Sequence, residues 1–145
     1  MTIPEKITRN GKDSWVEREI TVGNITKGEE LVKTFSIYDS KFPPDMSEKV
    51  GALPVIEGEN VRVDLTKKVN KPLPYWHRNL DYDEVIFVVK GKVKWYTEVG
   101  TYELKEGDVL IIPRGIAHRN EPIGETNYIA LEIKLRDAKC LTCEK

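Results

Sequence analysis

Two histidines and one glutamate stand out as residues that could bind a metal ion. His77 and His118 are the only histidines of the chain, and Glu84 follows the first of them by seven residues. Two imidazoles and one carboxylate with open coordination positions form the facial triad that non-haem Fe(II) favours. Fe(II) is therefore the expected ion, although the same ligands also bind Zn, Mn, Ni or Co. Asn79 is a candidate further ligand through its amide oxygen.

Arginines and aromatic residues near these positions are candidates for contacting a small-molecule ligand or substrate. A guanidinium group can hold a carboxylate with two parallel hydrogen bonds, and an aromatic ring can stack on a flat ligand. Surface salt bridges and core packing are the competing interpretations, and the sequence assigns no catalytic residue. The candidates are Tyr75, Trp76, Arg78, Tyr96, Arg114 and Arg119, with Arg62 as a further arginine.

Short runs of β-branched and aromatic residues, separated by Gly and Pro turns, predict an all-β fold. The segment 41–60 is rich in Pro and Gly and predicts a long loop, with one helical turn near 45–50. The expected strands are 15–22, 31–38, 60–66, 84–90, 93–98, 101–104, 108–112, 116–120 and 127–135.

The strand pattern also bears on the proposed ligands. Glu84 shares a face of its strand with Ile86 and Val88, and a carboxylate on an apolar face is costly unless it is paired or bound to a cation. An odd number of residues separates His77 from Glu84, so one continuous strand would turn them to opposite faces. The polar stretch 80–83 therefore predicts a bend, and His118 begins a further strand after the turn 113–115.

Two segments resemble the sequence motifs of the cupin superfamily. The first motif, G-x5-H-x-H-x(3,4)-E-x6-G, is matched at His77, Glu84 and Gly91. The second motif, G-x5-P-x-G-x2-H-x3-N, is matched at Gly107, Pro113, Gly115 and His118. The departures from the two motifs are Lys71, Asn79 and Pro122.

This resemblance implies one cupin domain over residues 1–145, folded as a jelly-roll barrel, also called a double-stranded β-helix. The barrel core is expected at about residues 60–135, with loose tails at 1–14 and 138–145.

A longer stretch, HRNLDYDEVIFVVKGKVKWYTEVGTYELKEGDVLIIPRGIAHR, is similar to the amino-terminal cupin half of homogentisate 1,2-dioxygenases. The resemblance implies a ring-cleaving dioxygenase of a phenolic or aromatic small molecule. In that family the catalytic iron lies in the carboxy-terminal half, and the amino-terminal half usually lacks the second-motif histidine, which is His118 here. Two alternatives stay open: a ligand-binding or sensing cupin without turnover, and a metal-dependent isomerase or decarboxylase. The matching positions are His77, Arg78, Asn79, Asp81, Asp83, Glu84, Phe87, Ile112, Pro113, Arg114, Gly115 and Arg119.

Composition narrows the classes of partner. The net charge is −1, so no bulk positive charge favours nucleic acid or an anionic membrane. The chain has no apolar run long enough to span a bilayer, and charged residues interrupt its first residues, so a cytoplasmic protein is expected. Strand edges need protection, which predicts a homodimer with its interface within residues 15–38.

Cys140 and Cys143 form a C-x-x-C pattern close to the last residue. The expectation is a frayed tail with two reduced thiols. A disulfide and an intermolecular metal site are the alternatives.

Overall fold

The computed structural model describes residues 3–20, 31–39, 41–42, 52–67, 75–124 and 127–143. These residues form ten β-strands joined by turns and bends, and they contain no helix. The chain divides into two units, residues 1–36 and 37–145, which are taken separately here. None of the described residues belongs to a helix that could span a membrane.

The first unit contains a two-stranded antiparallel hairpin of β1 (Ile3–Arg9) and β2 (Lys12–Arg18). Its turn is Asn10-Gly11, and both residues have positive φ angles, of 52° and 74°. Such a turn suits the right-handed twist of two paired strands. Residues 3–9 and 12–18 thus form paired strands where a loose segment was expected over residues 1–14, and Asn10-Gly11 is the hairpin signal in the sequence.

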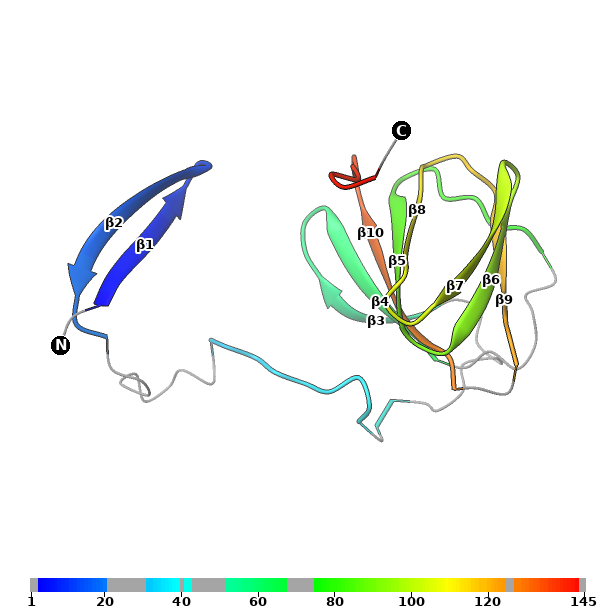
Figure 1. Ribbon diagram of the computed structural model, residues 1–145, viewed down its shortest axis with the longest axis horizontal. Coiled ribbons are helices and arrows are strands. Elements are labelled where there is room, and N and C mark those ends of the chain that lie inside the picture. Colours follow the sequence, from blue (N-terminus) through cyan, green and yellow to red (C-terminus); the bar gives the residue numbers. More distant parts are fainter. Residues whose placement is uncertain are drawn as a thin grey trace. The chain divides into compact units, whose positions relative to one another are not determined.

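The second unit contains two antiparallel sheets (Figure 1). The five-stranded sheet has the order β3-β4-β10-β5-β8, and the three-stranded sheet has the order β7-β6-β9. This all-β architecture confirms the predicted cupin jelly roll. The bounds are β3 Leu53–Glu57, β4 Val61–Lys67, β5 Asp83–Lys90, β6 Lys92–Thr97, β7 Gly100–Lys105, β8 Val109–Ile112, β9 His118–Pro122 and β10 Ile129–Leu135.

The apolar core lies between these two sheets. β5 contributes Ile86 and Val88 from one sheet, and β6 contributes Val93 and Trp95 from the other. All four side chains are buried, as is Tyr128, which precedes β10. The face of β5 that carries Ile86 and Val88 also carries Glu84, so the core places a carboxylate inside the barrel.

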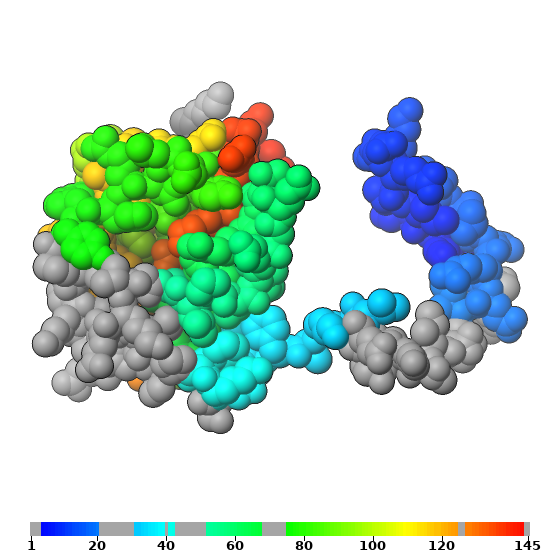
Figure 2. Space-filling view, turned by 180° about the vertical axis from the view of Figure 1, so that it is seen from behind, coloured from blue at the N-terminus to red at the C-terminus, as the bar shows by residue number. Residues whose placement is uncertain are grey.

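The space-filling view in Figure 2 shows the outer side of the larger sheet. The teal residues of β3 and β4 lie beside the orange-red residues of β10 and the green residues of β5, in agreement with the strand order. β3 falls within the segment 41–60, for which a loop was expected, so that part of the expectation is wrong.

Residues 31–38 and the two cysteines differ from the structure expected for them, and two other predictions fall wholly or partly outside the described residues. Residues 31–38 form turns and bends and not the expected strand. The helical turn near 45–50 lies outside the described residues, and so does part of the segment 15–38, for which a dimer interface stays a prediction. Cys140 and Cys143 form a disulfide, so the expectation of reduced thiols is wrong.

Candidate metal centre

Backbone pairing brings His77 and His118 together. His118 is the first residue of β9, and His77 forms an isolated antiparallel bridge with it. The chain then bends at Leu80 and Asp81 before β5 begins at Asp83. This is the bend that the odd spacing requires, and it turns Glu84 toward the two histidines.

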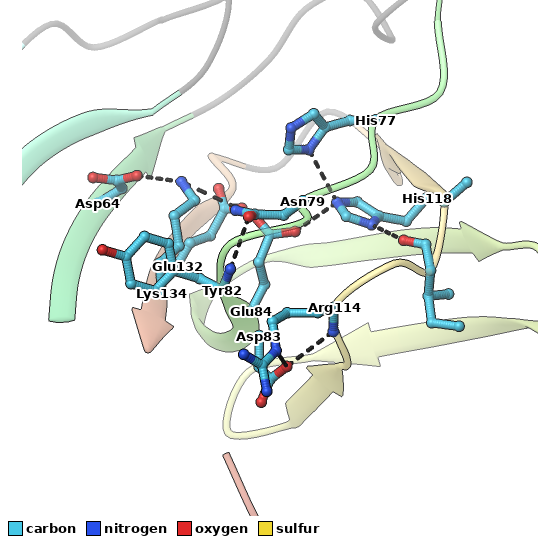
Figure 3. Close-up of polar contacts among 12 residues, drawn as sticks. Asp64, His77, Asn79, Tyr82, Asp83, Glu84, Arg114, His118, Glu132 and Lys134 are labelled. Carbon is cyan, nitrogen blue, oxygen red and sulfur yellow. Dashed lines mark hydrogen bonds and ion pairs between the residues drawn. The ribbon is translucent and has the colours of Figure 1, made fainter. Parts of the chain in front are cut away.

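The three predicted ligands gather at one point in the barrel (Figure 3). One ligand atom from each of His77, Glu84 and His118 lies within 4.8 Å of the others. Nε2 of His118 is 2.7 Å from Oε2 of Glu84 and 3.4 Å from Nδ1 of His77. Glu84 and His118 are 3% and 5% exposed, whereas His77 is exposed, so the cluster is closed on one side and accessible at His77.

The contact between His118 and Glu84 fits a bound cation. Nδ1 of His118 lies 2.9 Å from the carbonyl oxygen of Ile116 and donates its hydrogen there. In a neutral imidazole Nε2 then carries a lone pair that faces Oε2 of Glu84, a buried oxygen that has no donor when His118 is in this tautomer. Two acceptors at this distance repel each other unless a proton or a metal ion lies between them.

The electrostatics of this pair point the same way. Burial alone would raise the pKa of Glu84, but the hydrogen bond and charge of His118, with Lys134 and His77, lower it below its usual value. Burial alone would lower the pKa of His118, but Glu84 raises it above its usual value. Both shifts favour the charged forms, a carboxylate and an imidazolium, and a divalent cation bound here would take the place of the imidazolium proton.

A charged layer continues from Glu84 across the larger sheet. β10 places Lys134 opposite Glu84 on β5 and opposite Arg62 on β4. Nζ of Lys134 forms an ion pair with Asp64 and lies 4.0 Å from Oε1 of Glu84. Asp64 is fully buried and also accepts a hydrogen bond at Oδ2 from Nη2 of Arg62 at 3.0 Å, while Nε of Arg62 forms an ion pair with Oδ1 at 2.9 Å.

Glu132 of β10 adds a third carboxyl group to this layer, after Glu84 and Asp64. The Thr66 hydroxyl donates to it, and the register places it opposite Asp64 on β4 and Ile86 on β5. Burial raises the pKa of Glu132 above its usual value, although the Thr66 hydrogen bond and the Lys134 charge oppose the shift. Glu132 therefore favours its neutral form more than an exposed glutamate does.

Asn79 is near the cluster, but its amide oxygen is engaged by the backbone. Oδ1 accepts the N–H groups of Asp81 and Tyr82, both at 2.9 Å, and so stabilises the bend (Figure 3). A ligand role for Asn79 stays a prediction.

Arg114 is engaged with carboxylates of this chain, on the side of β5 opposite to the ligand atoms. Its Nε is 3.3 Å from Asp83, and its Nη2 is 2.7 Å from Asp137. Asp83 also accepts the backbone N–H groups of Arg114 and Ala138. Burial alone would raise the pKa of Asp83, but these hydrogen bonds and the Arg114 charge lower it.

Arg119 and Tyr96 extend from neighbouring positions of β9 and β6, next to the positions of His118 and Trp95 but on the opposite face. The Arg119 guanidinium lies 4.2 Å from the Tyr96 ring centre and 5.7 Å from that of Trp76, and it pairs with Glu121 at 2.6 Å. The remaining candidates, Tyr75 and Arg78, are exposed. The structure thus brings the three predicted metal ligands together, and of the six candidate ligand-contacting residues it brings Trp76, Tyr96 and Arg119 into contact with one another.

The sequence analysis missed most of the charged layer. Arg62, Asp64 and Thr66 alternate along one strand, and Glu132 and Lys134 alternate along another. Polar residues at alternate positions usually mark the solvent face of a strand. Both strands carry residues of either charge, which can form ion pairs if the strands lie side by side. This complementarity is the signal in the sequence that could have identified an interior charged layer.

The part of the chain that matches a known protein family lies within the second unit. Residues 55–134 match the protein family described as Cupin domain. A protein of Saccharolobus solfataricus named "Putative dioxygenase" is 33% identical over 64 residues, which cover 44% of this chain. The match spans only 17% of that relative's length.

Solved structures support the fold. A structure from Ralstonia eutropha described as a "putative mannose-6-phosphate isomerase" aligns with a TM-score of 0.61 and 17% identity, covering 72% of this chain and 99% of that one. A cupin-2 domain protein from Shewanella frigidimarina aligns with a TM-score of 0.51 and 20% identity, covering 79% and 95%. At such identities the likeness concerns the fold alone.

Proposed function

This chain belongs to the cupin family, and we propose that it is a metal-dependent enzyme that uses Fe(II) and dioxygen to oxidise a phenolic or other aromatic small molecule. The observation that carries the proposal is the cluster of His77, Glu84 and His118, with ligand atoms within 4.8 Å of one another. Two imidazoles and one carboxylate leave coordination positions for other molecules, as non-haem iron chemistry requires.

Two similarities support oxygen chemistry over other reactions of this fold. The stretch from His77 to Arg119 is similar to the amino-terminal half of homogentisate dioxygenases, and the Saccharolobus relative is named as a dioxygenase. The fold alone does not identify the reaction, because proteins with the same barrel fold catalyse many different reactions.

The chain's own residues prepare the site in three ways. The carbonyl of Ile116 fixes the His118 tautomer, so that Nε2 and not Nδ1 faces the ion. Lys134 lies beside Oε1 of Glu84 and leaves Oε2 directed at the histidines. The apolar side chains below the cluster keep bulk water from its buried side, which strengthens its electrostatic interactions. Bound Fe(II) would supply a redox-active Lewis acid.

Metal analysis and oxygen uptake test the proposal. Protein purified without added metal should contain iron in proportion to chain, and it should consume dioxygen with homogentisate, gentisate, a catechol or hydroxyanthranilate. Failure to bind Fe(II), Mn(II), Ni(II) or Zn(II) on reconstitution would contradict any metal-dependent function. Stoichiometric metal without oxygen uptake would favour a decarboxylase, an isomerase or a binding protein instead.

A further inference from the structure

A pocket of about 270 Å³ lies near the predicted metal ligands, although none of the three ligands lines it. Lys134 and Asn79 are among its lining residues, and both are neighbours of the ligand cluster: Lys134 Nζ is 4.0 Å from Glu84, and Asn79 follows His77 by two residues. A volume of this size is close to that of sites for a single small molecule.

The wall of this pocket presents two cations held in place by one carboxylate. Asp64 binds Nε and Nη2 of Arg62, so the opposite edge of the guanidinium, with Nη1, is directed away from Asp64. Within the described part of the chain, no residue pairs with Nη1. Lys134 is held by the same Asp64 and has two further N–H donors. Both cations are therefore fixed, and both retain donors for a ligand.

Charge balance indicates the kind of ligand. When a divalent ion is held by Glu84 and two neutral imidazoles, the formal positive charges of Arg62, Lys134 and the metal exceed the negative charges of Asp64 and Glu84 by two. The other acidic residues of the pocket, Glu57, Glu59 and Asp81, are exposed, so water and salt screen their effect.

We propose that Arg62 and Lys134 form an anion-binding subsite, which holds a carboxylate or similar anionic group of the substrate while another part of the substrate reaches the metal. This inference rests on the proposed function for its connection to the metal. Among the candidate arginines of the sequence analysis this assigns the role to Arg62 and not to Arg114, which is engaged by Asp83 and Asp137. A guanidinium and an ammonium converging on one pocket suit a carboxylate better than a neutral amide.

Calorimetric titration of the Zn-loaded protein with benzoate and with benzamide tests the subsite. Zn is redox-inactive, so no turnover interferes, and the two probes differ chiefly in charge. We expect benzoate to bind more tightly than benzamide, and Arg62→Gln to weaken benzoate binding by about tenfold or more. The matched control is Arg18→Gln, which removes an arginine from the hairpin of the other unit.

A second variant keeps the subsite testable if Arg62→Gln does not fold. Lys134→Met alone leaves Asp64 with one partner, so Asp64→Asn combined with Lys134→Met removes both members of the buried pair. The double variant should bind benzoate more weakly than the unaltered protein but keep part of its preference over benzamide, since Arg62 remains. Equal binding of both probes to the unaltered protein, or benzoate affinity unchanged in folded Arg62→Gln, would overturn the subsite.

The same titration on metal-free protein separates the two proposals. If neither zinc nor Fe(II) binds, the proposed function fails, but an Arg62-dependent preference for benzoate would still support the subsite. If zinc binds and the Arg62→Gln variant behaves as the unaltered protein, only the subsite fails.

Discussion

The main chains of His77 and His118 hold each other: His77 N donates to the His118 carbonyl at 2.8 Å, and His118 N donates to the His77 carbonyl at 2.9 Å. Neither bond depends on a side chain. The two imidazoles are therefore placed by backbone geometry, and replacement of one ring leaves the bridge intact.

His118→Ala should for that reason abolish metal binding without unfolding the protein. The variant loses one ligand and the buried imidazole that contacts Trp95, at 5.7 Å between ring centres. The loss of packing and of the partner of the buried Glu84 carboxylate should cost about 3–5 kcal/mol of unfolding free energy. Metal content after reconstitution and dialysis measures the effect, with circular dichroism as the check of folding. Unchanged metal content in folded His118→Ala would show that the ligand assignment is wrong.

Asn79→Ala should lower stability and leave metal content unchanged. The variant removes the acceptor for the backbone N–H groups of Asp81 and Tyr82, which should cost about 1–2 kcal/mol. Urea denaturation of the metal-free protein measures the cost, and metal analysis of the reconstituted protein gives the second readout. A folded variant that no longer retains metal would identify Asn79 as a ligand.

Asp83→Asn should destabilise the protein far more than Asp137→Asn, although both carboxylates pair with Arg114. Asp83 is buried and accepts two backbone N–H groups, so an amide there cannot satisfy the same donors, at a cost of about 2 kcal/mol or more. The Asp137 side chain is 84% exposed, and its pair with Arg114 should contribute below about 1 kcal/mol. Equal unfolding midpoints for the two variants would contradict this assignment.

Removal of metal should lower the melting temperature. An ion that binds only the folded state adds about 2.7 kcal/mol of stability at a free concentration of 100 times Kd. Thermal melts of chelated and reloaded protein should differ, whereas His118→Ala should melt at one temperature in both conditions. A shift of similar size in His118→Ala would mean that the ion binds elsewhere.

The local sequence was sufficient for the ligand set and for most strands of the barrel. Motif spacing identified His77, Glu84 and His118, and parity required a bend between the first two, which occurs at Leu80 and Asp81. β3 was not predicted because Pro54 and the glycines around it are typical of loops. The strand nevertheless pairs with β4, across a register shift. Pairing with a neighbour decides the state of such a short segment, and local composition does not contain that information.

The sequence by itself determined the alternation of Arg62, Asp64 and Thr66 with Val61, Val63 and Leu65, because side chains of a strand point to opposite faces in turn. Which face lines the barrel was decided only by the tertiary structure. Alternation alone assigns the charged face to water. The pairing of β4 with β10, and of β10 with β5, instead brings Arg62, Asp64 and Lys134 beside Glu84. Opposite charges from three strands satisfy one another there, and this makes a charged layer stable inside the barrel beside the metal ligands.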